Sequence, residues 1–326
     1  MNAIHLAAGR ASLRDFRFMI PRKFGLRRKS LLLLVGEAAL AIMSMTALAQ
    51  QWQDAPAYAK INADNVLRRS VYFVPSYGAV YPEKFVVLLK HLPFIRGVII
   101  HNHGCGGQIG WETHVSQFYY RQGFAVIAPE FVTRKDNKLG CAGGTREEAM
   151  ASAGQRFKEG VYTARNPARL AARGDDIEQV VHWLKTQTTL PIILSGHSEG
   201  CRTVYHWNRA DPQIIGGICH KQSLNSAYEH LWRWNTSLPL WSSLEDEDAW
   251  AGGSKQSPAV GFERKFTGDP GKLTTVRIAG SSHDPLIHKV ETDSLQQWLN
   301  DRVPSRPPQT GFNYETALPE IQQKLQ

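Results

Sequence analysis

A serine between two glycines is the pattern in this sequence that most directly indicates chemistry. Residues 196–200 read Gly-His-Ser-Glu-Gly, with Ser198 at the centre. The segment follows the apolar, β-branched run 191–194 and opens a stretch of helical character. It therefore predicts a tight strand–turn–helix junction that presents the serine hydroxyl at the end of a strand. Glycine at both flanks relieves the crowding that side chains would cause in such a turn, and we predict Ser198 to be a nucleophile.

A serine hydroxyl needs a base, and the base needs an acid to hold it. In proteins with this junction the acid and then the histidine follow the serine along the chain. His283 follows the last predicted strand and is our candidate base, with His288 as the alternative. The acid should follow the strand at 240–241, where Asp248 is our first candidate and Asp246 the alternative. A solvated acidic loop or a weak calcium-binding turn would account for the same carboxylates without catalysis.

A glycine-rich turn at 103–107, His-Gly-Cys-Gly-Gly, supplies the third element of this chemistry. Acyl transfer places negative charge on a carbonyl oxygen, and fixed backbone N–H groups stabilise that charge. One donor is expected from Glu199, directly after the nucleophile. The other is expected from Cys105 or Gly106, where small residues let the backbone approach a substrate.

The elements that must position these residues alternate between strand and helix patterns. Helical patterns are centred on residues 111–122, 177–184, 204–209 and 295–299. Apolar, β-branched runs predict strands at 71–74, 85–89, 97–100, 124–127, 191–194, 214–219, 240–241 and 276–278. Such alternation predicts an α/β protein whose mostly parallel central sheet is covered by helices on both faces. Residues 130–166 interrupt the rhythm and predict a long basic loop near the site.

The run 98–129, with its strand, glycine-rich turn and second strand, resembles the dienelactone-hydrolase branch of the α/β hydrolases. Asp175-Asp176 ahead of Trp183-Leu184, then the serine junction and His283, extend the likeness over about 200 residues. The resemblance implies the α/β-hydrolase fold and hydrolysis of an ester or lactone through an acyl-enzyme. It implies a small-molecule ester as partner, and neither a metal nor an organic cofactor. One departure matters, because dienelactone hydrolases proper use cysteine where this chain has Ser198, which points to a generic esterase or a prolyl-oligopeptidase-like peptidase.

Other interpretations compete with hydrolysis. A non-catalytic binding protein could use the same fold, and transfer of the acyl group to an acceptor other than water would use the same triad. His101 and His103 resemble half of a zinc-hydrolase signature, but the Asp-His pair expected two residues later is absent. Gly104-Cys105 stands there instead, and we predict no metal site. Four tryptophans between the serine and the candidate acid either line a substrate pocket or pack in the core: Trp232, Trp234, Trp241 and Trp250.

The first 49 residues have the pattern of a signal peptide. A basic stretch precedes the apolar run 31–49, which ends in Ala-Leu-Ala, and cleavage there would leave Gln50 first. Translation starting at Met19 and an uncleaved membrane anchor are the alternatives. We therefore predict a leader at 1–49, a catalytic domain at 50–303 and an extension at 304–326, in a periplasmic or secreted protein.

The net charge of +9 is concentrated in this leader, which holds eight basic and two acidic residues. The rest of the chain carries 30 basic and 27 acidic residues, a net charge of +3, which is too small an excess to predict a nucleic-acid partner.

Four cysteines suit an oxidising compartment. We favour the pairs Cys105–Cys141 and Cys201–Cys219, because the second would tie the helix after the serine to the following strand. Free buried thiols are the alternative. Oligomeric state is not readable from the sequence.

Overall fold

The computed structural model describes residues 65–104, 107–108, 110–131, 161–224, 229–251 and 253–305. All of them lie in the compact unit Pro56–Gln326. An eight-stranded sheet in the order β2-β1-β4-β3-β5-β6-β7-β8 forms its centre. The strands are β1 Val71–Val74, β2 Gly78–Val80, β3 Val98–Asn102, β4 Ala125–Ala128, β5 Ile192–His197, β6 Ile214–His220, β7 Leu240–Glu245 and β8 Leu273–Ile278.

The strands from β4 to β8 run parallel, whereas β1 pairs antiparallel with both β2 and β4. The central strands β3 and β5 are buried along their whole length, as a sheet covered on both faces requires. The predicted mostly parallel sheet is thus confirmed. The helices are α3 Val66–Arg69, α4 Pro82–His91, α5 Gly110–Arg121, α7 Val161–Gln187, α8 Glu199–His206 and α9 Lys289–Arg302. Short 3-10 turns stand at η1 Glu229–Leu231, η2 Ala249–Ala251, η3 Glu263–Lys265 and η4 Pro270–Lys272.

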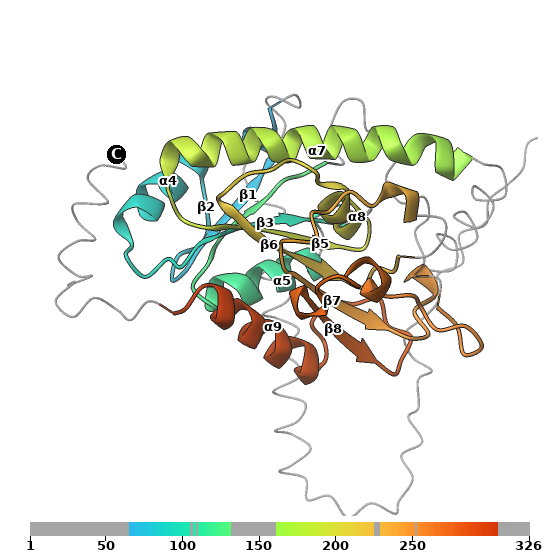
Figure 1. The fold of residues 1–326 in the computed structure, drawn as a ribbon. Helices are drawn as coiled ribbons and strands as arrows, with labels where there is room; N and C mark the ends of the chain where they lie inside the picture. Colours follow the sequence, from blue (N-terminus) through green and yellow to red (C-terminus); the bar gives the residue numbers. More distant parts are fainter. Residues whose placement is uncertain are drawn as a thin grey trace, which may run out of the picture. The chain divides into compact units, whose positions relative to one another are not determined.

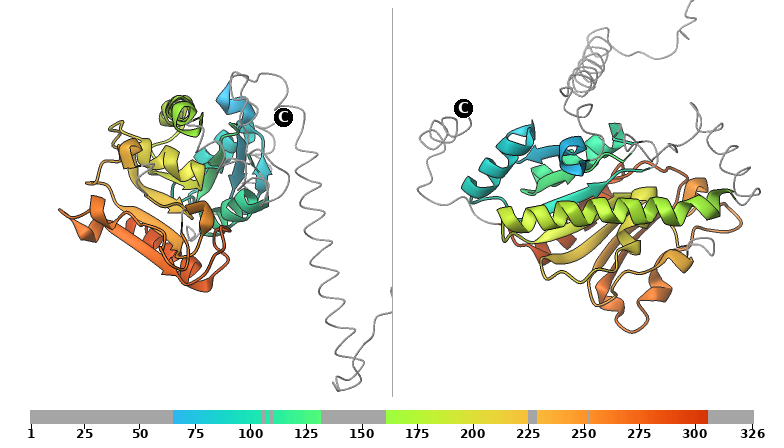
Figure 2. Two further views of the ribbon diagram at one scale, coloured as in Figure 1. Left: turned by 90° about the vertical axis from the view of Figure 1, so that its right-hand side faces the viewer. Right: turned by 90° about the horizontal axis from the view of Figure 1, so that it is seen from above.

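Helices cover both faces of the sheet (Figures 1 and 2), with α4, α7 and α8 on one and α5 and α9 on the other. Alternating side chains of β1 show the division. The Tyr72 ring lies 5.0 Å from Phe85 of α4 and 6.1 Å from Trp183 of α7, whereas Phe73 stacks on Tyr120 of α5 at 6.3 Å. The strand therefore contributes side chains to both layers of the core.

The register of the parallel strands brings their carboxyl ends to one edge of the sheet. Asn102 of β3 pairs with Gly196 of β5, and His197 pairs with His220 of β6. His220 pairs in turn with Ser243 of β7. The segments that follow β3, β5, β7 and β8 therefore meet at this edge, and these segments carry the candidate site.

Residues 85–89 were predicted as a strand, and this prediction is wrong, because they lie in α4. Pro82 occupies the first helical turn, where its missing N–H costs nothing, and Glu83 follows it near the positive end of the helix dipole. Phe85, Leu88 and Leu89 are buried at helical spacing. The antiparallel strand in this part of the chain is the shorter β2, which lacks a strong apolar run.

Two other boundaries differ from prediction. Helix α7 begins at Val161, so the expected loop 130–166 includes its first residues, while 132–160 lie outside the described residues. Helix α8 ends at His206 instead of continuing to 209. The predicted leader, residues 1–49, also lies outside the described part, as does all but the start of the extension 304–326. Among the helices that are described, none is long and apolar enough to cross a membrane.

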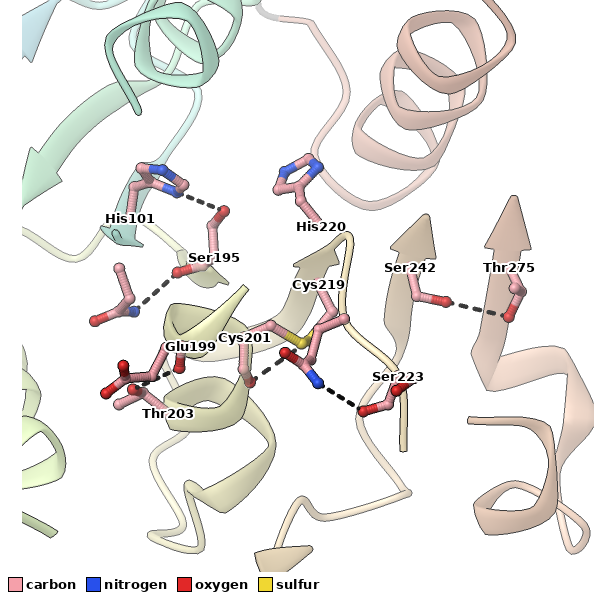
Figure 3. Close-up of a disulfide and its surroundings, with 12 residues drawn as sticks. His101, Ser195, Glu199, Cys201, Thr203, Cys219, His220, Ser223, Ser242 and Thr275 are labelled. Atoms are coloured by element: carbon pink, nitrogen blue, oxygen red, sulfur yellow. Dashed lines mark hydrogen bonds between the residues drawn. A yellow bond between two sulfur atoms is a disulfide. The ribbon is translucent and has the colours of Figure 1, made fainter. Parts of the chain in front are cut away.

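A disulfide joins Cys201 in α8 to Cys219 in β6, which confirms that predicted pair (Figure 3). Both residues are fully buried. The bond closes a segment with a sequence separation of 18 and ties the helix that follows the serine to the neighbouring strand. The other predicted pair, Cys105–Cys141, lies outside the described residues.

Candidate active site

Ser198 lies in a turn of high strain between β5 and α8. Its backbone has φ 53° and ψ −116°, a conformation that residues with a side chain rarely adopt. The turn is tight enough that a Cβ on Gly196 would lie 2.2 Å from the carbonyl carbon of Gly200. A Cβ on Gly200 would lie 1.9 Å from the carbonyl oxygen of Asn102. Both glycines of the motif are therefore required by contact with neighbouring backbone, as the sequence predicted.

His283 and Asp248 are hydrogen-bonded, with 2.6 Å between His283 Nδ1 and Asp248 Oδ2. Asp248 is fully buried. Its other carboxylate oxygen, Oδ1, accepts the backbone N–H groups of Trp250 at 2.9 Å and Ala251 at 3.4 Å. The acid is thus fixed by the turn η2, and it holds the imidazole by the nitrogen that faces away from a nucleophile in a catalytic triad.

The segment bearing His283 is fixed to the serine turn through His197. The backbone carbonyl of His283 accepts a hydrogen bond from His197 Nε2 at 3.0 Å, and the two rings are 5.1 Å apart. Because His197 directly precedes Ser198, this contact joins the turn of the serine to the turn of the histidine. Glu245 fixes the same segment from the other side, since its Oε2 accepts the N–H of Ser282 at 2.5 Å.

The two alternative candidates from the sequence, His288 and Asp246, make contacts outside the Asp248–His283 pair. His288 Nε2 lies 3.0 Å from Glu245 Oε1, and the residue caps α9. Asp246 forms an ion pair with Arg277 near the surface, where the side chain of Asp246 is 34% exposed and that of Arg277 is 39% exposed. His288 is thus paired with Glu245 and Asp246 with Arg277, whereas Asp248 is paired with His283.

The glycine-rich turn begins beside the serine. A Cβ on Gly104 would lie 3.5 Å from the Cβ of Ser198. The buried guanidinium of Arg173 donates to the carbonyl oxygens of His103 at 2.9 Å and Gly104 at 3.4 Å. The turn is therefore held from the α7 side, while Cys105 and Gly106, the predicted oxyanion donors, lie outside the described residues.

Glu199, the other predicted donor, is the first residue of α8 and is buried. Its N–H belongs to the first helical turn, where backbone N–H groups lack partners within the helix. Its carboxylate lies 3.6 Å from the guanidinium of Arg173.

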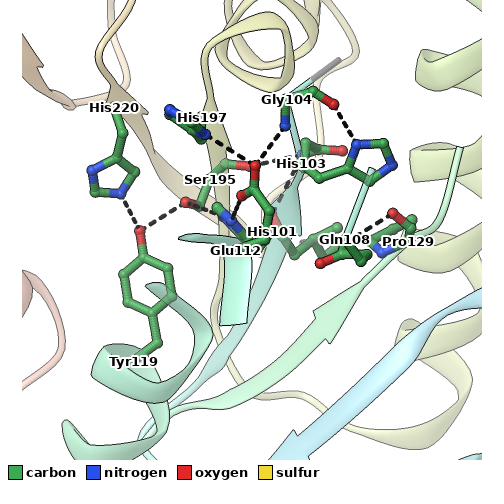
Figure 4. Close-up of polar contacts among 12 residues, drawn as sticks. His101, His103, Gly104, Gln108, Glu112, Tyr119, Pro129, Ser195, His197 and His220 are labelled. Carbon is green, nitrogen blue, oxygen red and sulfur yellow. Dashed lines mark hydrogen bonds and ion pairs between the residues drawn. The ribbon is translucent and has the colours of Figure 1, made fainter. Parts of the chain in front are cut away.

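A network of buried polar side chains underlies the serine turn and the glycine-rich turn (Figure 4). Its centre is Glu112, in the first turn of α5, which is 2% exposed. Glu112 Oε1 accepts the N–H of Gly104 at 2.8 Å and a hydrogen bond from His197 Nδ1 at 2.9 Å. Its Oε2 lies 2.7 Å from His101 Nε2.

The network continues from His101 across the sheet. His101 Nδ1 lies 3.0 Å from Ser195 Oγ, which lies 2.7 Å from the hydroxyl of Tyr119. That hydroxyl lies 2.8 Å from His220 Nε2. Burial, followed by the charges of His101 and His197, holds the pKa of His220 well below its ordinary value, so this histidine is neutral.

Sequence reasoning did not single out Glu112 or Arg173. The signal available for Glu112 was its place at the start of the helix that follows the glycine-rich turn. Nothing in the sequence distinguished it from a solvated acid at a helix N-terminus, because its burial comes from the packing of α5 against the sheet.

The tryptophans divide between the two roles considered. Trp234 and Trp241 are buried, and Trp232 packs on Tyr205 at 5.8 Å, so these three belong to the core. Trp250 lies beside the site, with its ring 5.8 Å from that of His283.

His101 and His103 have separate partners: His101 bonds Glu112 and Ser195, whereas His103 Nε2 accepts the N–H of Phe131 at 2.9 Å. Within the part of the chain that the structure describes, no group of three or more His, Cys, Asp or Glu side chains is placed to hold a metal ion.

The strand order and the strained serine turn after β5 define the α/β-hydrolase fold. No protein-family model matches this sequence, and no curated protein matches it. Several solved structures resemble it. A cold-adapted esterase from an Arctic intertidal metagenomic library is 17% identical, with a TM-score of 0.43 over 72% of this chain and 88% of that one.

Two further similar structures are an esterase domain from Rhodothermus marinus and a protein from Klebsiella pneumoniae described as a dienelactone hydrolase. The first is 14% identical, with a TM-score of 0.42 over 71% of this chain and 92% of that one. The second is 14% identical, with a TM-score of 0.42 over 65% of this chain and 88% of that one. Our assignment of the fold rests on the strand order and the serine turn.

Proposed function

We propose that this protein is a serine hydrolase that cleaves carboxylic ester or lactone bonds, with Ser198, His283 and Asp248 as its catalytic residues. The observation that carries the proposal is the bond between His283 and buried Asp248, on segments that adjoin a strained serine turn. Strain of this kind persists where the surrounding structure maintains it, and it is common at catalytic residues.

In the proposed reaction, Ser198 Oγ attacks the carbonyl carbon of the ester while His283 Nε2 takes the serine proton. Asp248 holds Nδ1–H and so keeps Nε2 free to accept that proton. The backbone N–H groups of Glu199 and of Cys105 or Gly106 stabilise the oxyanion. His283 then gives the proton to the leaving alcohol, and water releases the acid by the same steps in a second round.

Two alternatives to the hydrolysis of small esters differ from it in substrate or in the need for catalysis. A prolyl-oligopeptidase-like peptidase would share the triad and differ in substrate. A binding protein without catalysis would not need the buried acid to hold the imidazole, and the Asp248–His283 bond favours the enzyme.

Labelling with a fluorophosphonate probe, followed by peptide mass mapping, tests the proposal. Such a probe forms a stable adduct with a serine that is activated and lies beside a working oxyanion site. We expect one adduct, on Ser198, and none in Ser198→Ala. If folded wild-type protein remains unlabelled and hydrolyses none of a panel of p-nitrophenyl esters, the proposal is wrong and the binding-protein interpretation gains.

We also propose that the protein is exported, to the periplasm or beyond, with cleavage after Ala49. The basic stretch and apolar run of residues 1–49 support this, as does the buried Cys201–Cys219 disulfide, which is typical of oxidising compartments. N-terminal sequencing of protein recovered from the periplasm should find Gln50 first. Recovery of an intact terminus at Met1 or Met19 would contradict cleavage.

A further inference from the structure

His197, the residue before the candidate nucleophile, is buried between two hydrogen-bond acceptors. Its Nδ1 faces Glu112 Oε1 at 2.9 Å, and its Nε2 faces the carbonyl oxygen of His283 at 3.0 Å. A carbonyl oxygen only accepts, so Nε2 must carry a hydrogen. An ionised carboxylate also only accepts, so Nδ1 carries the second hydrogen and the ring is an imidazolium.

Glu112 is in turn saturated by donors from three segments. It accepts from His101 of β3, from Gly104 of the glycine-rich turn and from His197 of the serine turn. Burial opposes its ionisation, but the charge of His197 and the hydrogen bonds from His101 and His197 hold the pKa of Glu112 well below its usual range. A carboxylate that accepts three hydrogen bonds in a buried site stays ionised.

We propose that Glu112 and the His197 imidazolium are positioning residues that hold the serine turn, the glycine-rich turn and the backbone of His283 in one arrangement. This inference rests on the proposed hydrolase function. Figure 4 shows Glu112 between His197 and Gly104, which lie on two different turns. One ion pair thus connects all three parts of the proposed catalytic machinery.

The charge state of His197 sets a pH dependence. Burial disfavours the charged ring, but the charge and hydrogen bond of Glu112, the carbonyl of His283 and the charge of Asp248 outweigh it and raise the pKa of His197 above its ordinary value. The remaining titratable neighbours are His101, which shares Glu112, His220, which is neutral, and the ring of His283, 5.1 Å from that of His197. The ion pair between Glu112 and His197 is complete at pH values below this raised pKa and is lost as the pH rises through it. Activity should therefore fall on the alkaline side.

Kinetics of Glu112→Gln test the role of the carboxylate. We expect kcat for a p-nitrophenyl ester to fall about 10²-fold with a smaller change in KM, because misplacement of a catalytic group by about 1 Å costs that much. The alkaline limb of the kcat profile should move to lower pH, since the charge that stabilises the imidazolium is gone. Asp176→Asn is the matched control: it removes another buried carboxylate, paired with Arg69 at 2.7 Å, and should leave the pH profile unchanged.

A second variant and a spectroscopic measurement separate positioning from general loss of structure. His197→Gln keeps a neutral donor for the His283 carbonyl but cannot be charged, so it should retain part of the activity and lack the alkaline limb. In wild-type protein labelled with ¹⁵N-histidine, both ring nitrogens of His197 should show imidazolium shifts at neutral pH.

Neutral-imidazole shifts for His197, or pH profiles of both variants that superimpose on the wild type, would overturn the inference while leaving the hydrolase proposal standing. If wild-type Ser198 is not labelled by the fluorophosphonate probe, the hydrolase proposal fails instead. The shift measurement needs no activity, so the two failures are distinguishable.

Discussion

Replacing His283 with alanine should lower kcat for ester hydrolysis by a factor on the order of 10⁶ and leave a residual rate from the oxyanion donors and binding alone. The reason is that Ser198 loses the base that takes its proton, while the serine turn itself is unaltered. KM should change far less than kcat, because the imidazole acts in the transition state. Steady-state kinetics on a p-nitrophenyl ester, with thermal unfolding as a check on folding, measure this.

His288→Ala is the matched control, since both histidines follow β8 and the sequence alone left both open as the base. His288 contacts Glu245 and caps α9, so its loss should cost stability of about 1 kcal/mol and little activity. Equal damage from the two substitutions, or full activity in His283→Ala, would refute the assignment of His283.

The residues that could be assigned from sequence are those whose chemistry depends on local spacing. The serine turn is one, because Gly196 is required by contact with the backbone of Gly200 in the same turn, although Gly200 is itself required by contact with Asn102 on β3. The strand ends around it followed from apolar runs that the parallel sheet buries on both faces. Helix α4 was missed because Phe85 to Leu89 is apolar enough for either element, and only packing against Tyr72 and Trp183 shows which face is buried.

The supporting residues could not be predicted for a related reason. Glu112 is eight residues after Gly104 in sequence, yet its partners include His197, which is 85 residues away. Burial of a carboxylate among histidines from separate strands is set by the register of β3 and β5, which no local pattern encodes. The choice between Asp246 and Asp248 was open for the same reason. The two acids are distinguished by their tertiary partners, Arg277 for Asp246 and His283 for Asp248, and not by local sequence.

Replacement of the proposed triad acid, Asp248, is the second substitution expected to have a large effect on kcat. Asp248→Asn should lower kcat by a factor on the order of 10⁴, as loss of the carboxylate does in a triad of this kind. The surroundings determine how the amide sits. The N–H groups of Trp250 and Ala251 already donate to the Oδ1 position, so the amide oxygen of asparagine occupies that place. Its NH₂ group then faces His283 Nδ1 and donates to it.

An imidazole that accepts at Nδ1 must carry its hydrogen on Nε2, and it then cannot take the proton of Ser198. The variant should therefore fold like the wild type and yet be nearly inactive, a separation that loss of a merely structural residue would not give. Asp246→Asn removes a carboxylate two residues away whose partner is the partly exposed Arg277, and it should keep activity near the wild-type level. If Asp246→Asn were the inactive variant and Asp248→Asn the active one, the acid of the triad would be Asp246, and the Asp248–His283 bond would be structural.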